Sequence, residues 1–375
     1  MAIYDDLGIR RVLNADARLT RLGGSLMPAE VRRAMDAAAA SYVDIVELHD
    51  AVGRRLAELT NNEAACVTTG AAAGLTLAAL ACMTGDDPAA IARTPDRSGL
   101  PSKVVYQRPH RIAYLPSVAL AGATLVEIGV EPEVHPAELE LAIDDDTAAV
   151  LFVAGEHLAE GALPLEEIAA IAHARGVPVI VDAAAQLPPP ENLWRYTRDG
   201  GADLAIFSGG KDLRGPQASG LVVGRPDLVA AIRQHGSPNP RLGRSMKVGK
   251  EEMAGLLAAV ERYLAEDHDA RIRGFEADVA GWVAAFSAVP GVEAAREFPN
   301  EAGQPMPRCR VTFSGPDATA RRDAVVRALW EGNPRIAVKA CGDDAISLTP
   351  DTLEPGEAAV VADRLLLALR ASLPS

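Results

Sequence analysis

A lysine and an aspartate each follow an apolar run, in positions where their side chains could act on a carbonyl compound. Lys211 stands in a glycine-rich loop directly after the apolar run 202–208, and Asp182 ends the apolar run 177–182. Desolvation in such a setting lowers the pKa of a lysine and prepares it to form a Schiff base. A buried carboxylate could pair with the protonated ring nitrogen of a pyridine cofactor. The simpler interpretations are a surface lysine in a turn and an aspartate that caps the next turn.

Small and hydroxyl-bearing residues supply a third feature, a candidate phosphate site. Residues 67–74 read Val-Thr-Thr-Gly-Ala-Ala-Ala-Gly and run from a predicted strand into a predicted helix. Unpaired backbone N–H groups at a helix start favour a phosphate, and Thr69 and Ser208 add hydroxyl donors. A phosphate-binding turn, a carboxylate and a lysine together match what pyridoxal 5'-phosphate requires, so the sequence predicts that cofactor.

Alternating strands and helices would hold these residues at one edge of a sheet. Short β-branched runs predict strands, and amphipathic stretches between them predict helices. The predicted strands are 64–68, 103–107, 124–128, 148–154, 177–182, 202–208 and 220–223, with 309–313 and 345–348 nearer the C-terminus. Apolar strands separated by helices indicate an α/β fold whose mostly parallel sheet is covered on both faces. The carboxyl ends of such strands form the ligand-binding crevice.

The same periodicity predicts three segments along the chain. Residues 1–60 form an N-terminal helical segment, and residues 61–250 form the large cofactor-binding domain. Residues 251–375 form a linker helix and a small C-terminal α/β domain, the helical pattern of the linker running over 250–288. The proline-rich and charged stretch 86–102 is predicted to be a long loop, a kind of segment that is often functional.

Composition excludes several classes of protein. The 375 residues are 49% hydrophobic and 23% charged, which is typical of a globular protein and excludes disorder or a disulfide scaffold. The net charge of -14 disfavours nucleic acid as a partner. The four cysteines lack metal or disulfide spacing, which predicts no metal site and a reducing cytoplasm. No apolar run reaches the ~18 residues of a membrane span, so neither a membrane nor export is expected.

Several short motifs occur in the order found in a known group of enzymes. They are Asn14-Ala15, Leu22-Gly23-Gly24-Ser25, Val67 to Gly74, Asp182-Ala183-Ala184, Ser208-Gly209-Gly210-Lys211 with Gly215-Pro216-Gln217, and Gly243 to Glu251. This text resembles the fold type I pyridoxal-phosphate enzymes, in the branch of selenocysteine synthase and D-glucosaminate-6-phosphate ammonia lyase. The resemblance covers the chain from about residue 8 onward, and the lysine loop is its most specific part.

The resemblance implies how the cofactor would be held. Lys211 would form the Schiff base with its aldehyde, and Asp182 would hold its pyridine nitrogen. Gly70 and Ala71 would bind the phosphate through their backbone N–H groups.

The resemblance also implies residues on the two faces of the cofactor ring. Ala184 would pack on one face. His110 would stack on the opposite face and serve, with Lys211, as a candidate donor of a proton to a leaving hydroxyl group. A surface histidine in a loop is the alternative interpretation of His110.

Arginines are the candidates for binding an anionic substrate, because the guanidinium group matches carboxylates and phosphates. Arg335 is the preferred carboxylate partner, since the C-terminal lobe of fold type I enzymes commonly supplies one. Arg18 and Gln107 are the other predicted substrate-binding residues. Further candidates among the arginines are Arg21, Arg111 and Arg244. The sequence departs from the branch at Ala17 and Arg335, where glycine and proline are expected.

The resemblance implies a lyase acting on a small anionic amino acid or amino sugar acid. Abstraction of the α-proton and β-elimination would give a 2-oxo acid and ammonia. An amino-acid racemase or aldolase is the alternative, and a pyridoxal-phosphate-binding protein without turnover is a third. A selenium transferase is disfavoured, because a tRNA needs a basic surface. The resemblance further implies a homodimer or a larger even-numbered assembly, with the N-terminal helices and residues 86–102 near the interface.

Overall fold

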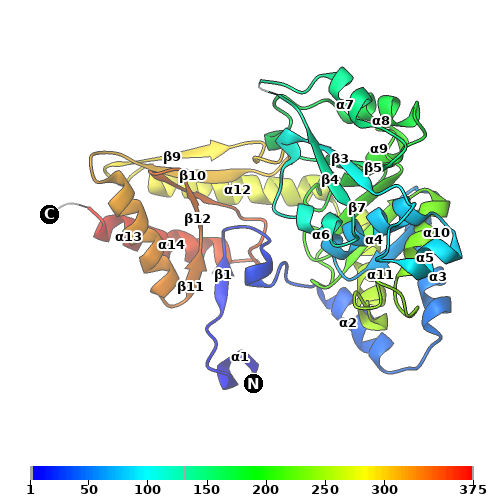
Figure 1. Ribbon diagram of the computed structural model, residues 1–375. Helices are drawn as coiled ribbons and strands as arrows, with labels where there is room; N and C mark the ends of the chain where they lie inside the picture. The colour runs from blue at the N-terminus through cyan, green and yellow to red at the C-terminus, as the bar shows by residue number, and fades with distance from the viewer. Residues whose placement is uncertain (1–2, 131, 374–375) are drawn as a thin grey trace. The chain divides into compact units, whose positions relative to one another are not determined.

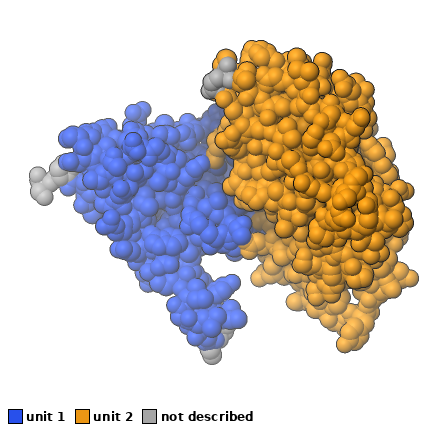
Figure 2. Space-filling view, in the orientation of Figure 1, with its two compact units in different colours: residues 1–26, 267–300, 304–375 blue, residues 27–266, 301–303 orange. Residues whose placement is uncertain are grey.

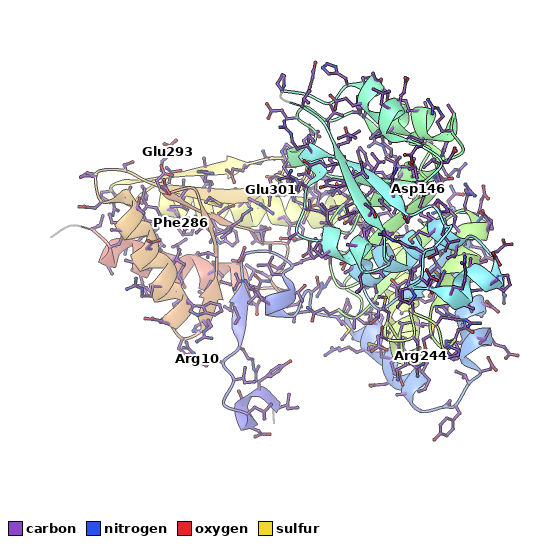
Figure 3. All side chains as sticks on the ribbon, viewed as in Figure 1. Arg10, Asp146, Arg244, Phe286, Glu293 and Glu301 are labelled. Atoms are coloured by element: carbon purple, nitrogen blue, oxygen red, sulfur yellow. The ribbon has the colours of Figure 1, made fainter. Side chains whose placement is uncertain are left out.

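The computed structural model describes residues 3–130 and 132–373, which divide into two compact units (Figures 1 and 2). Unit 2 comprises residues 27–266 and 301–303, and unit 1 comprises the rest. Residues 301–303, among them Glu301 (Figure 3), belong to unit 2, where the N–H of Glu156 donates to the carbonyl oxygen of Ala302 over 3.2 Å. Within the described residues, no helix is long and apolar enough to cross a membrane.

Unit 2 is built on a mostly parallel sheet. Among the described residues it has seven strands, in the order β2-β8-β7-β6-β5-β3-β4, of which only β8 runs antiparallel to its neighbours. The strands are β2 (Ala64–Thr68), β3 (Lys103–Gln107), β4 (Thr124–Ile128), β5 (Thr147–Val153), β6 (Val179–Asp182), β7 (Leu204–Ser208) and β8 (Gly220–Gly224). This is the predicted α/β fold, and each predicted strand of the large domain is present.

Helices cover both faces of this sheet. One face carries α2 (Ala29–Ala39), α3 (Ile45–Leu59), α7 (Pro136–Ala142), α8 (Leu165–His173), α9 (Asn192–Arg198) and α11 (Lys250–Ala265). The other face carries α4 (Ala71–Thr84), α6 (Leu115–Ala119) and α10 (Pro226–His235). Neighbouring strand residues alternate between the two cores, so that Val104 contributes to one and Val105 to the other. Burial on both sides explains why the strands are continuously apolar.

Two of the expected segments differ from the observed elements. The predicted loop 86–102 contains a short helix, α5 (Pro88–Arg93), because Asp87 accepts a hydrogen bond from the N–H of Ala89 over 2.8 Å and proline occupies the first turn. The helical pattern over 250–288 is two helices, α11 and α12 (His268–Phe286). The break lies at Asp267, whose carboxylate caps α12 by accepting from the N–H of Ala270 over 2.8 Å.

Unit 1 has a smaller sheet with helices on one side. Its described strands run in the order β12-β13-β10-β9, all antiparallel, and Figure 1 shows its helices gathered below β9 and β10. The strands are β9 (Val292–Glu297), β10 (Arg308–Phe313), β12 (Lys339–Cys341) and β13 (Ala345–Leu348), and the helices are α12, α13 (Ala318–Glu331) and α14 (Glu357–Ala371).

A parallel strand pair, β1 (Val12–Asn14) with β11 (Arg335–Ala337), joins the beginning of the chain to unit 1. The remaining short elements are α1 (Ile3–Asp6) and the single-turn helices η1 (Thr20–Leu22), η2 (Arg108–His110) and η3 (Glu156–Leu158). The helices α2, α3 and α11 belong to unit 2, which therefore begins before residue 60 and ends beyond residue 250.

Candidate cofactor and active site

The loop after β7 is closely packed and positions Lys211. The N–H of Gly209 donates to the carbonyl oxygen of Ser219 over 2.9 Å, and the N–H of Gly215 donates to that of Gly209 over 2.8 Å. A side chain at Gly210 would place its Cβ 2.6 Å from the Cα of Gln217, which leaves room only for glycine. The loop backbone is thereby fixed, and the half-buried Lys211 is held at the carboxyl end of β7.

Asp182 ends the adjacent strand β6 and is 6% exposed. Its Oδ1 accepts a hydrogen bond from the N–H of Ala184 over 3.0 Å. Burial raises the pKa of Asp182, and this hydrogen bond and the charge of Lys211 oppose the rise. The carboxylate and the ammonium group therefore lie close enough to interact at the same edge of the sheet.

The start of α4 forms the third part of the site. Gly70 caps this helix with φ 99°, a left-handed conformation that glycine adopts readily. The neighbouring strand β8 begins with Gly220. A Cβ on this residue would lie 2.5 Å from the carbonyl carbon of Gly70 and 2.8 Å from the nitrogen of Ala71. The turn can approach β8 only because residue 220 has no side chain. The strand register places Thr68, Gly220 and Ser208 in one row.

These three parts suit a phosphorylated pyridine aldehyde. The turn into α4 offers backbone N–H groups for a phosphate, the buried carboxylate of Asp182 offers a partner for a ring N–H, and Lys211 offers an amine. All belong to unit 2 and follow the carboxyl ends of β2, β6 and β7. By contrast, the described residues contain no group of three or more His, Cys, Asp or Glu that could hold a metal ion.

His110 is buried, at 1% exposure, in the turn that follows β3. The N–H of Val153 donates to its Nδ1 over 3.1 Å, which requires Nδ1 to be unprotonated and leaves the ring proton on Nε2. Its ring meets the ring of Phe152 edge-on, with centroids 4.6 Å apart. Burial lowers the pKa of His110 to about 4. The imidazole is therefore neutral near pH 7, a state suited to packing against a ring and poorly suited to donating a proton.

Gln107, predicted to bind substrate, has partners in the protein backbone. Its side chain is 0% exposed, its Nε2 donates to the carbonyl oxygen of Leu163 over 3.1 Å, and its Oε1 accepts from the N–H of Leu163 over 2.6 Å. The amide thus holds the segment between β5 and α8 in place. This role differs from the predicted contact with substrate.

The predicted substrate arginines Arg18 and Arg335 lie in unit 1 and have protein partners there. Arg18 forms an ion pair with Asp351, with side chains 10% and 8% exposed, and also donates to the Asp351 carbonyl oxygen over 3.1 Å. Arg335 donates from Nε to the carbonyl oxygen of Trp330 over 2.9 Å and stacks 4.5 Å from the centre of its ring.

Of the other candidate arginines, two also have partners within the protein and one is exposed. Arg111 donates from Nε to Glu127 over 2.7 Å, and Arg21 pairs with Asp16 over 2.9 Å. Arg244 is exposed on the loop between α10 and α11 (Figure 3).

Two residues that build the site were missed by sequence reasoning. Gly220 makes room for the turn into α4, and a glycine as the first residue of an apolar run was the available signal. Gln186 is 6% exposed, and its Nε2 donates to the carbonyl oxygen of Ala154 over 2.9 Å, which ties the segment after β6 to the end of β5. Its only signal was an amide four residues after Asp182.

The chain is similar in sequence and in structure to several known proteins. The family model described as SelA, L-seryl-tRNA selenium transferase, matches residues 17–274. A 5'-C-glycyluridine monooxygenase-decarboxylase of Streptomyces is 36% identical over 343 residues, 90% of this chain and 84% of that protein. D-glucosaminate-6-phosphate ammonia lyase of Salmonella typhimurium is 33% identical over 370 residues, 97% of this chain and 96% of that protein.

Solved structures extend the comparison. One of D-glucosaminate-6-phosphate ammonia lyase has a TM-score of 0.86 at 32% identity and covers 99% of both chains. One of serine palmitoyltransferase with pyridoxal phosphate, at 14% identity, has a TM-score of 0.62 over 96% of this chain and 88% of that chain, which shows the shared fold type I. Because the family model matches more than half of this chain, the chain belongs to the SelA family.

Proposed function

We propose that this enzyme is a pyridoxal-phosphate-dependent lyase. It removes the α-proton of an amino acid or amino sugar acid, eliminates the β-substituent, and releases a 2-oxo acid and ammonia. The observation that carries the proposal is the buried carboxylate of Asp182 beside the charge of Lys211. This pair lies in a chain that is 33% identical, over 97% of its length, to an ammonia lyase.

The cofactor, when bound, supplies an electron sink for the α-carbon of the substrate. Lys211 would provide the amine that links to it, and Asp182 would keep its ring nitrogen protonated. Gly70, Ala71, Thr69 and Ser208 would bind its phosphate. Ala184 and His110 would pack against its two ring faces.

Lys211 is the residue placed to move protons. Its Nζ would take the α-proton and, as an ammonium group, hold a proton for the leaving β-hydroxyl. His110 is neutral with its proton on Nε2, so we assign it to positioning and leave proton transfer to Lys211.

A second reaction deserves a direct test, because the Streptomyces relative is named a monooxygenase-decarboxylase and is 36% identical over 90% of this chain. An oxidative decarboxylation would consume O2 and release CO2 from the substrate carboxylate. Racemisation and aldol cleavage, the other outcomes expected of the same site, would give an enantiomer or an aldehyde. Each outcome has a product that the others lack.

The assembly and location that we propose are a homodimer or larger even-numbered oligomer in the cytoplasm, with a small anionic substrate. Light scattering after size-exclusion chromatography tests the assembly. A mass equal to one chain, with full activity, would contradict it.

The decisive experiment compares two lysine substitutions. Wild type, Lys211→Ala and Lys103→Ala would be incubated with pyridoxal phosphate, reduced with borohydride and digested. We expect mass spectrometry to find the pyridoxyl group on Lys211 in wild type and in Lys103→Ala, whose lysine lies at the amino end of β3, and to find none in Lys211→Ala. A modified lysine other than Lys211 would refute the assignment.

The reaction itself is tested with D-glucosaminate 6-phosphate and with β-hydroxy amino acids of both configurations. We expect ammonia and a 2-oxo acid in equal amounts, without O2 uptake, and no product from Lys211→Ala. Uptake of O2 with release of CO2 would instead support oxidative decarboxylation.

A further inference from the structure

A cavity of about 640 Å³ lies at the edge of the large sheet opposite the candidate cofactor site. Its lining adjoins the amino ends of β2 and β7 and the carboxyl end of β8, and includes Glu63, Asp203 and Arg225. All of its lining residues belong to unit 2. Lys211 follows the other end of β7, and the five residues of that strand, at about 3.3 Å each, separate the two edges by about 16 Å. The cavity is therefore distinct from the candidate active site.

The carboxylate of Asp203 holds one wall of this cavity together. Its Oδ2 accepts from the N–H of Val179 over 2.7 Å and from Nε2 of His173 over 2.8 Å, and its Oδ1 accepts from Arg225 over 2.8 Å. These bonds join the starts of β6 and β7 to the end of α8 and to the residue that follows β8. Asp203 is buried and its oxygens have partners within the protein, so this wall gives the cavity a defined shape.

Two opposite charges in the lining have no partner. Glu63 precedes β2 and Arg198 ends α9, and neither side chain forms a hydrogen bond or an ion pair within the part of the chain that the structure describes. They line one cavity without pairing with each other. Asn61 adds an exposed amide between α3 and β2, whereas the carboxylate of Glu58 pairs with Arg55 over 3.4 Å. The lining therefore offers one available cation and one available anion.

Three helices end at the same edge of the sheet. α3 ends at Leu59, α8 at His173 and α9 at Arg198, and each leads into a strand, β2, β6 or β7, that starts at this edge. The C-terminal end of a helix carries a partial negative charge and favours a cation. The cavity thus combines a guanidinium group for an anion with a carboxylate and helix ends for a cation.

We propose that this cavity binds a zwitterionic α-amino acid. The ligand carboxylate would accept hydrogen bonds from the guanidinium group of Arg198, and the ligand ammonium group would donate to the carboxylate of Glu63. An ion of one sign would neutralise only one of these two charges. Small-molecule sites typically have volumes of roughly 300–1,000 Å³, so the cavity admits an amino acid together with its side chain. The proposal does not involve Lys211 and is independent of the proposed function.

The binding experiment uses the full chain loaded with pyridoxal phosphate and reduced with borohydride. Reduction prevents Lys211 from forming a new bond to the amine of a probe. Calorimetry would measure the affinity for alanine, serine, leucine and glutamine of both configurations. Propionate and ethylamine, which are alanine without its ammonium group and without its carboxylate, are the matched controls. We expect an amino acid of this set to bind at least about tenfold more tightly than propionate and ethylamine.

Two variants locate the binding, and a third is their control. Arg198→Gln and Glu63→Gln should each weaken binding of the amino acid by about tenfold or more. Arg195→Gln is the control, because Arg195 lies one turn earlier on α9, is exposed and is not among the residues that line the cavity. It removes the same charge and should change the affinity by less than about twofold. Thermal unfolding would establish that each variant folds, and Glu63→Gln serves if Arg198→Gln does not.

Other outcomes would overturn the proposal. Absence of binding by every amino acid of the set, or binding that neither Arg198→Gln nor Glu63→Gln weakens, would show that the cavity is not an amino-acid site. Equal affinity for the amino acid and for propionate would show that the ammonium group is not recognised. Equal losses in Arg195→Gln and Arg198→Gln would show an effect of overall charge and not of this cavity.

Discussion

Burial determines the chemistry of the individual residues in this site. Asp182 and His110 are both almost inaccessible to solvent, and in both cases desolvation disfavours the charged form. The consequences for function differ. A neutral imidazole suits the packing role that we assign to His110, whereas the role that we assign to Asp182 requires its carboxylate to be ionised. A protonated ring nitrogen would restore that anion, so a ligand is expected to offset the desolvation of Asp182.

The first prediction concerns Asp182→Asn. Because the folded state raises the pKa of Asp182 above its ordinary 3.8, the native protein retains a proton that the unfolded chain releases, and the free energy of unfolding falls as pH rises through this range. Asparagine keeps an oxygen that accepts from the N–H of Ala184, and because it does not ionise, it removes this pH-dependent decrease in stability. We expect the variant, free of cofactor, to unfold at a higher temperature than wild type at pH 7, with a smaller difference at pH 4.

The same substitution should impair function. Loss of the carboxylate is expected to lower kcat/KM by about two orders of magnitude or more. Calorimetric scans and steady-state kinetics measure the two effects. A variant that is both less stable without cofactor and fully active would contradict the role assigned to Asp182.

At the scale of elements, the sequence predicted the strands of unit 2 well, and in unit 1 it predicted β10 and β13 but neither β9 nor β12. The runs 64–68, 103–107 and 124–128 coincide with β2, β3 and β4, since strands buried on both faces read as continuous apolar runs. The strand β9, Val292–Glu297, reads Val-Glu-Ala-Ala-Arg-Glu, which contains no apolar run, and it was missed. Its pairing with β10, which lies more than ten residues later, is a tertiary contact that no local pattern encodes.

The parts of the candidate site that could be predicted are those where the residue type and its position after a strand together suggest one role. Lys211 and Asp182 lie where strand ends were expected to place them. Arg18, Arg335 and Gln107 were predicted from residue type and from the family resemblance, and their partners Asp351, Trp330 and Leu163 are distant in sequence or belong to the backbone. A guanidinium or amide group satisfied within the protein has the same sequence signature as one that awaits a ligand.

A prediction at this scale concerns the close approach of β8 to the turn before α4. Gly220→Ala would place a methyl group 2.5 Å from the backbone of Gly70, and the turn would have to shift. We expect a loss of about 1–3 kcal/mol in the free energy of unfolding and at least tenfold weaker binding of pyridoxal phosphate, measured by urea denaturation and by titration.

Gly281→Ala is the control for that substitution. Gly281 lies within α12 with no atom within 4 Å of an added Cβ, so alanine there should stabilise the protein by about 0.5–1 kcal/mol and leave cofactor affinity unchanged. Equal effects of the two substitutions would contradict the steric argument.

At the scale of the whole molecule, three buried histidines link stability to acidity. Burial is the main cause that lowers the pKa of His49, His110 and His235 to about 4, and all three lie in unit 2. Between pH 6.5 and pH 4 the unfolded chain binds protons at these residues and the native protein does not. The free energy of unfolding must therefore decrease as pH falls through this window, and be independent of these groups above it.

This linkage is the whole-molecule prediction. Urea denaturation at pH 7.5, 6.5 and 5.5 should show stability falling below pH 6.5. His49→Gln, which retains a donor for the carbonyl oxygen of Val67, should flatten that dependence, whereas substitution of the exposed His135 by Gln should leave it as in wild type. A stability that is constant from pH 7.5 to pH 5.5 would show that these histidines are not neutral in the native state.

The position of β4 at the end of the large sheet bears on how the protein behaves in concentrated solution. Within the described residues β4 pairs only with β3, so its other side offers backbone groups to which a strand of another molecule could add. Glu127 lies on this strand, where it accepts from Tyr106 over 2.8 Å and binds Arg111. Charged side chains on an edge strand disfavour its pairing with a strand of another molecule, so we expect substitution of Glu127 by an apolar residue to increase aggregation.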